Sequence, residues 1–172
     1  MSTLKPSISE KDHVQGGQSA SIEIVEFGDY ECPHCGNAYP IVKEIEETFG
    51  NQIKFVFRNF PLREAHPLAF PAALAAEAAA LQGKFWEMHD AIYENQYRLS
   101  EELFVELAET IGLDLDRFSE DSEADDTHQK IENDFESGIR SGVNGTPAFY
   151  VNGTKFDGGA IDLYQTLKES AE

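Results

Sequence analysis

Both cysteines of this 172-residue chain lie three positions apart, at Cys32 and Cys35, and this spacing most constrains what the chain can fold into. They closely follow residues 21–27 (SIEIVEF), a short stretch rich in β-branched residues that predicts a buried strand. Because the chain has no other cysteine, a scaffold of several disulfides is excluded. The sequence therefore predicts a fold stabilised by a hydrophobic core, with the cysteine pair between a strand and a helix that begins near Pro33.

The rest of the pattern predicts an α/β domain that is interrupted by helices. A strand over residues 52–60 follows the first helix, and residues 67–82, 84–97 and 100–111 have helical patterns, as does a segment that ends near Gly142. Two short strands around Asn152-Gly153 and a helix over residues 161–170 complete the order. We expect a flexible N-terminal segment over residues 1–20, a core of residues 21–62 and 143–172, and an inserted helical domain over residues 63–142.

The charge of the chain disfavours two classes of partner. Lys and Arg number 13 against 32 Asp and Glu, so the formal net charge is −19. Such a surface repels nucleic-acid phosphates and anionic membranes, and we expect neither as a partner. The first twenty residues contain no apolar run of the kind found in signal peptides. We therefore expect a cytoplasmic protein; the alternative is a periplasmic or extracytoplasmic protein whose signal peptide has been removed.

The position of the two cysteines predicts thiol chemistry. A helix N-terminus stabilises a thiolate, so Cys32 is expected to be the nucleophile, and Cys35, one turn later, is expected to resolve its mixed disulfides. His34 adds a donor or a partial positive charge that lowers the pKa of Cys32. Asp29 and Glu31 would oppose thiolate formation if they point at Cys32, so the direction of the redox reaction stays open.

Three segments resemble the DsbA-like thiol–disulfide oxidoreductases of the thioredoxin superfamily. They are residues 26–35 (EFGDYECPHC), 57–62 (FRNFPL) and 142–149 (GVNGTPAF), and the resemblance extends over about residues 12–170. It implies a thioredoxin fold with a helical domain inserted between the second and third core strands. It also implies protein thiol–disulfide exchange through the Cys32-Pro33-His34-Cys35 motif.

The same resemblance implies roles for residues outside the cysteine pair. Glu26 matches a buried acidic residue that handles protons for Cys35. Thr146-Pro147 matches a cis peptide whose backbone pairs with an extended substrate segment, and Pro33, Thr146 and Pro147 are the expected substrate-binding residues.

Three other functions are alternatives to disulfide exchange. Cys32, His34 and Cys35 could be soft metal ligands, but structural zinc sites use four, so we expect no metal and no organic cofactor. His13, His66, His89 and His128 are interpreted as surface or helix residues. The alternatives are a glutathione-dependent kappa-like transferase or isomerase and a redox-sensing module that binds a partner. We expect cysteine-containing protein or peptide substrates, an unidentified redox partner, and a monomer.

Overall fold

The computed structural model describes residues 2–171, which pack as two compact units. The first, here called the core unit, contains the chain up to Gly28, Pro33–Arg58 and the chain from Glu136 onward. The second, the helical unit, contains Asp29–Cys32 and Asn59–Phe135. The expected insertion over residues 63–142 thus differs from the helical unit at both ends, and residues 136–142 pack with the core unit.

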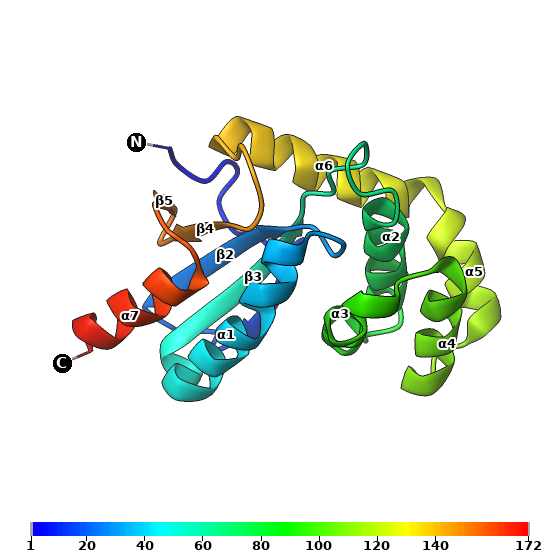
Figure 1. Ribbon diagram of the computed structural model, residues 1–172, viewed down its shortest axis with the longest axis horizontal. Coiled ribbons are helices and arrows are strands. Elements are labelled where there is room, and N and C mark those ends of the chain that lie inside the picture. The colour runs from blue at the N-terminus through cyan, green and yellow to red at the C-terminus, as the bar shows by residue number, and fades with distance from the viewer. Residues whose placement is uncertain (1, 172) are drawn as a thin grey trace. The chain divides into compact units, whose positions relative to one another are not determined.

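A five-stranded sheet forms the centre of the core unit (Figure 1). Its strands are β1 (His13–Gly16), β2 (Ile22–Gly28), β3 (Ile53–Asn59), β4 (Ala148–Val151) and β5 (Thr154–Phe156), in the order β1-β3-β2-β4-β5. β1 pairs antiparallel with β3, and β4 pairs antiparallel with both β2 and β5. The predicted strands over residues 21–27 and 52–60 match β2 and β3 to within one residue at each end, and β4 and β5 flank Asn152-Gly153 as expected, which confirms the α/β class.

The described residues also form seven α-helices and two short 3₁₀ helices. They are α1 (Pro33–Phe49), η1 (Gly50–Gln52), α2 (Ala69–Ala80), α3 (Phe85–Glu94), η2 (Gln96–Arg98), α4 (Glu101–Ile111), α5 (Leu115–Glu123), α6 (Asp125–Ser141) and α7 (Ala160–Ser170). In the core unit α1 packs against α7, and in the helical unit α2 packs against α3, α4 and α5 (Figure 1). No helix within residues 2–171 is long and apolar enough to cross a membrane.

Local sequence explains where several helices begin and end. Pro33 opens α1, where a missing N–H is tolerated, and Gly50 follows its last residue with φ = +51°. The side chain of Ser100 accepts a hydrogen bond from the Leu103 N–H at 3.0 Å and caps α4. Gly112 ends α4 in the left-handed conformation, with φ = +93°. The start of α1 at Pro33 and the limits of α4 agree with the predicted helices near Pro33 and over residues 100–111.

The N-terminal segment and the part of the chain that forms α5 differ from the sequence prediction. Residues 13–16, which we expected to be flexible, form β1 and pair with β3 from His13↔Phe57 to Gly16↔Lys54. The residues of β1 are half-buried or exposed. Its sequence therefore lacks the apolar alternation by which a strand is predicted. Helix α5 was also missed, because only Phe118 is buried in this acidic nine-residue helix.

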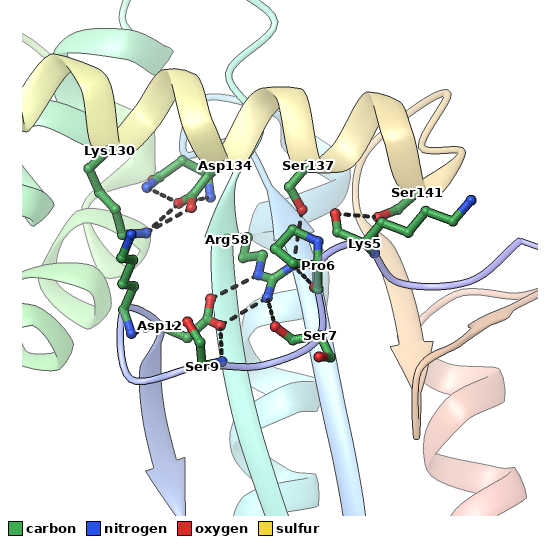
Figure 2. Close-up of polar contacts among 12 residues, drawn as sticks. Lys5, Pro6, Ser7, Ser9, Asp12, Arg58, Lys130, Asp134, Ser137 and Ser141 are labelled. Atoms are coloured by element: carbon green, nitrogen blue, oxygen red, sulfur yellow. Dashed lines mark hydrogen bonds and ion pairs between the residues drawn. The ribbon is translucent and has the colours of Figure 1, made fainter.

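Within the core unit, the side chain of Arg58 links the N-terminal segment to β3 (Figure 2). Its guanidinium donates to both carboxylate oxygens of Asp12, at 2.8 and 2.9 Å, and both side chains are almost fully buried. It also donates to the carbonyls of Pro6 and Ser7 and to the hydroxyl of Ser137. Because a buried guanidinium needs partners for its N–H groups, this cluster explains why the segment before β1 is ordered.

Replacing Asp12 by alanine should therefore destabilise the core unit. The variant Asp12→Ala leaves a buried positive charge without its carboxylate partner, which typically costs about 3–5 kcal/mol. We expect a loss of that order in the free energy of unfolding, measured by urea denaturation.

The chain supplies a matched control for this measurement. Arg63 and Glu132 form an ion pair at 3.3 Å whose side chains are 59% and 52% exposed. Glu132→Ala should change the free energy of unfolding by at most about 1 kcal/mol. Equal effects of the two substitutions would contradict the structural role given to Asp12.

A second buried polar cluster lies in the helical unit. The Asn59 amide nitrogen donates to Glu77 Oε2 and Asp134 Oδ2, each at 2.9 Å, and the Asn59 backbone N–H donates to Asp134 at 3.0 Å. Lys130 contacts both oxygens of Asp134 at 2.8 Å (Figure 2). Burial is the largest cause that raises the pKa of the Asp134 carboxyl, and the nearby Glu77 carboxylate raises it further. This cluster holds the chain where it leaves β3.

The raised pKa of Asp134 predicts how stability depends on pH. Since the folded chain binds this proton more tightly than the unfolded chain, its contribution to stability is lost as pH rises from the unfolded pKa, near 4, through the folded value. Asp134→Asn lacks this titration. We therefore expect the free energy of unfolding of the wild type to fall relative to that of the variant over this range, measured by denaturation at several pH values. Parallel profiles would contradict the assignment.

Candidate active site

The first cysteine lies in a tight turn that directly follows β2. Gly28 ends the strand, and a Cβ atom there would lie 2.5 Å from the ring of Phe57, so no larger residue fits. The Cys32 N–H donates to the Asp29 carbonyl at 3.1 Å and closes the turn. Cys32 itself is 4% exposed, and α1 begins at the next residue. The sequence prediction of a cysteine between a buried strand and a helix N-terminus is confirmed.

The carboxylate of Asp29 holds this turn from within. One oxygen, Oδ1, accepts hydrogen bonds from the backbone N–H groups of Glu31 and Cys32, at 2.8 and 3.1 Å. The other, Oδ2, accepts from the Leu62 N–H at 2.9 Å and from His66 Nδ1 at 2.8 Å. The Asp29 side chain is completely buried. Four donors compensate the cost of burying a carboxylate, and they join the turn to the segment after β3.

The neighbouring Glu31 makes a parallel connection. Its Oε1 accepts from the Leu68 N–H at 2.8 Å, at the end of the loop that carries His66. The hydrogen bond from His66 to Asp29 is the largest cause that raises the pKa of the imidazole, and the charges of Asp29, Cys32 and Glu31 also raise it. The loop before α2 therefore places a basic ring among the acidic groups of the turn.

The outer side of the turn is also hydrogen-bonded. The Gln96 side-chain amide donates to the carbonyls of Tyr30 and Cys32, at 2.9 Å each. Tyr30 is buried, and its hydroxyl lies 2.9 Å from His89 Nδ1 within an aromatic cluster that includes Tyr93. The side chains and backbone of residues 29–32 are thus held by several parts of the helical unit. This arrangement fixes the backbone on which Cys32 is presented.

Helix α1 carries the other members of the motif in the core unit. Cys35 is completely buried in the first turn of the helix, and His34 precedes it. His34 lines a cavity of about 450 Å³ together with Thr146 and Pro147, and the remaining lining comes from α1, from the two glycines before α7 and from the first turn of α7. The Thr146-Pro147 peptide is cis, as the family resemblance implies. Three of the predicted site residues are therefore brought to one cavity.

Glu26 lies where the sequence places it, on a buried strand. It is 3% exposed and is in register with Phe149 of β4. The role of Glu26 in carrying protons for Cys35 stays a prediction. Within residues 2–171 the structure contains no cluster of three or more His, Cys, Asp or Glu side chains arranged to bind a metal ion.

Sequence reasoning missed part of the surroundings of Cys32. Asp29 was considered only as a charge opposed to thiolate formation, whereas its carboxylate organises the turn. His66 was interpreted as a surface or helix residue, yet it lies in the loop before α2 and bonds to Asp29. Gln96 was not considered at all. No local pattern marks His66 and Gln96, because their contacts with the turn join segments more than thirty positions apart, whereas Asp29 bonds to residues of its own turn.

Comparisons with known proteins agree on the family. The model of the thioredoxin family matches residues 8–167. Among curated relatives, the Na⁺/H⁺ antiporter NhaA 1 of Salinispora arenicola is 44% identical over 155 residues, and NhaA of Herminiimonas arsenicoxydans is 35% identical over 156 residues. These matches cover 90% of this chain but only 24% and 25% of the two relatives, so the chain spans about a quarter of their length.

Solved structures are similar over nearly the whole chain. Oxidised BdbD from Bacillus subtilis superposes with a TM-score of 0.84 at 27% identity, covering 99% of this chain and 95% of that one. A thioredoxin-like oxidoreductase from Silicibacter pomeroyi gives 0.82 at 27% identity, with coverage of 95% and 94%. The thiol–disulfide exchange protein α-DsbA2 from Wolbachia pipientis gives 0.81 at 25% identity, with coverage of 94% and 88%. Taken with the cysteine motif and the cis Thr146-Pro147 peptide, these similarities show that the chain belongs to the thioredoxin family, as a DsbA-like member.

Proposed function

We propose that this protein is a thiol–disulfide oxidoreductase that exchanges disulfides with cysteine-containing proteins or peptides. The observation that carries the proposal is the cysteine motif at the start of α1, in a chain whose fold matches a thiol–disulfide exchange protein and a thioredoxin-like oxidoreductase. Ion antiport is named for the curated relatives, but most of their length lies outside the match. The proposed chemistry concerns only this chain and the quarter of each relative that it matches.

In the oxidising direction, the reaction begins with a disulfide between Cys32 and Cys35. A substrate thiolate attacks the Cys32 sulfur, so that a substrate–Cys32 bond forms while Cys35 leaves as a thiolate. A second substrate thiolate then attacks the substrate sulfur of this mixed disulfide and releases Cys32. The substrate gains one disulfide, the protein gains two electrons, and Glu26 is the proposed proton carrier for Cys35. A partner disulfide must reoxidise the pair.

The cavity of the core unit is the proposed substrate site. His34, Thr146 and Pro147 line it beside the apolar side chains of Ala38, Ile41, Ala160 and Ile161. An extended peptide could place apolar side chains there while its backbone pairs with Thr146. This proposal explains why an apolar cavity lies beside α1, the helix that carries His34 and Cys35 of the cysteine motif.

The compartment follows from the proposed direction of exchange. An oxidant for proteins needs surroundings in which disulfides persist, and the cytoplasm keeps most thiols reduced. The oxidising role therefore favours the extracytoplasmic alternative over the cytoplasmic location that the first twenty residues led us to expect.

The variant Cys35→Ser tests the exchange chemistry directly. It keeps the nucleophile but lacks the thiol that resolves mixed disulfides, so covalent adducts between Cys32 and substrate proteins should accumulate. We expect these adducts on non-reducing gels of cells that express the variant, identified by mass spectrometry.

Cys32→Ser is the matched control and should trap nothing through the nucleophilic position. If Cys35→Ser forms no adducts yet retains glutathione-dependent turnover, a kappa-like transferase or isomerase is favoured instead. Retained affinity for a partner without any adduct would favour the redox-sensing module.

The reduction potential tests the direction of exchange. For an oxidant we expect equilibrium with glutathione buffers to give a potential more positive than the cytosolic glutathione poise of about −220 to −260 mV. The redox state of the pair is followed by alkylation and mass spectrometry. A value at or below that range would contradict the oxidising role and the extracytoplasmic location together.

A further inference from the structure

A histidine outside the cysteine motif is tied to the active-site turn by a buried carboxylate. His66 Nδ1 lies 2.8 Å from Asp29 Oδ2, in the loop that joins β3 to α2. A carboxylate can only accept hydrogen bonds, so Nδ1 carries the proton of this bond. The same carboxylate accepts the Cys32 N–H through its other oxygen, at 3.1 Å. One buried group therefore positions both the histidine and the nucleophilic residue.

The tautomer of His66 leaves its second nitrogen available for a proton. With Nδ1–H directed at Asp29, Nε2 is the position at which the imidazole becomes a cation. The His66 side chain is 22% exposed, so its charge is partly shielded from solvent yet can equilibrate with it. Asp29 thus favours the charged ring without closing it off from water.

The ionised groups that act on His66 come from the active-site turn. Asp29, Cys32 and Glu31 each raise the pKa of the imidazole through their negative charges. Charge coupling is reciprocal, so the imidazolium must favour the Cys32 thiolate by the same interaction free energy with which the thiolate favours the imidazolium. The other cation of this loop, Arg63, is paired with Glu132 and lies 3.9 Å above the ring of Phe70. The charge of His66 is therefore coupled to that of Cys32.

We propose that Asp29 and His66 form a positioning pair for Cys32, in which Asp29 holds His66 in the charged form and the positive charge of His66 stabilises the Cys32 thiolate. This inference rests on the proposed function, because only a nucleophilic Cys32 makes use of it. It assigns to an Asp–His pair outside the cysteine motif a part of the tuning that the sequence assigned to His34. A more stable thiolate also stabilises the reduced protein and makes its disulfide a stronger oxidant.

The variant His66→Gln tests the charge of the ring. Glutamine keeps a polar side chain that can donate to Asp29 but cannot become a cation. In a Cys35→Ser background, the ultraviolet absorbance of the thiolate reports Cys32 alone as pH is varied. We expect the apparent pKa of Cys32 to rise, and the rate of its alkylation at a pH below that pKa to fall about three- to tenfold.

A second substitution separates charge from structure. His66→Lys restores a positive charge but not the imidazole geometry, so the alkylation rate should return to within about twofold of that of the parent. If His66→Lys behaves like His66→Gln, the effect is structural and the proposal is wrong. His128→Gln changes a half-buried histidine of α6 in the helical unit and should leave the titration of Cys32 unchanged.

The wild-type cysteine pair gives an independent readout. At a fixed ratio of glutathione to its disulfide, His66→Gln should lower the ratio of reduced to oxidised protein about three- to tenfold. An unchanged ratio together with an unchanged titration overturns the proposal. Because Cys35→Ser adducts test exchange chemistry separately, trapping with no effect of His66→Gln would refute the positioning pair while the proposed function stands.

Discussion

The buried carboxylate of Asp29 is the group on which the geometry of the cysteine turn depends. A turn between a strand and a helix leaves backbone N–H groups that no regular structure satisfies, and two of them, from Glu31 and Cys32, donate to Asp29. The same side chain accepts from Leu62 and His66, so the turn is fixed to a segment that enters the fold more than thirty residues later. Rigidity at Cys32 therefore comes from local hydrogen bonds within the turn together with long-range ones from Leu62 and His66.

The same device recurs where β3 ends. Arg58 and Asn59 are consecutive, and successive side chains of a strand point to opposite faces. Arg58 is committed to Asp12 and the N-terminal segment of the core unit, whereas Asn59 is committed to Glu77 and Asp134 of the helical unit. Each of these buried side chains donates hydrogen bonds to residues distant in sequence. The exit of β3 thus specifies both the N-terminal segment and the path of the following loop.

Local sequence patterns were sufficient for most of the fold, and they failed where pairing is distant. The apolar stretch at residues 22–28 and the Ser100 and Gly112 helix signals act through near neighbours, so β2 and α4 could be predicted. β1 is short and partly exposed, and its pairing with β3 joins positions some forty residues apart. His66 stands alone in its loop, and only the fold brings it to Asp29. Site residues that lie together in one motif can be predicted from the sequence. Site residues that only the fold brings together, such as His66 and Asp29, cannot.

The hydrogen bonds of the acidic residues beside Cys32 decide how strongly these residues oppose the Cys32 thiolate. Two carboxylates next to a thiol would raise its pKa if their charges were unopposed. Asp29 is neutralised in part by four donors, one of them a basic ring, and Glu31 accepts from the Leu68 N–H. The carboxylates that would oppose the thiolate are the same groups that favour a cation at His66. The turn therefore keeps its shape around the buried Asp29 carboxylate, and the same carboxylate favours a positive charge at His66 that stabilises the Cys32 thiolate.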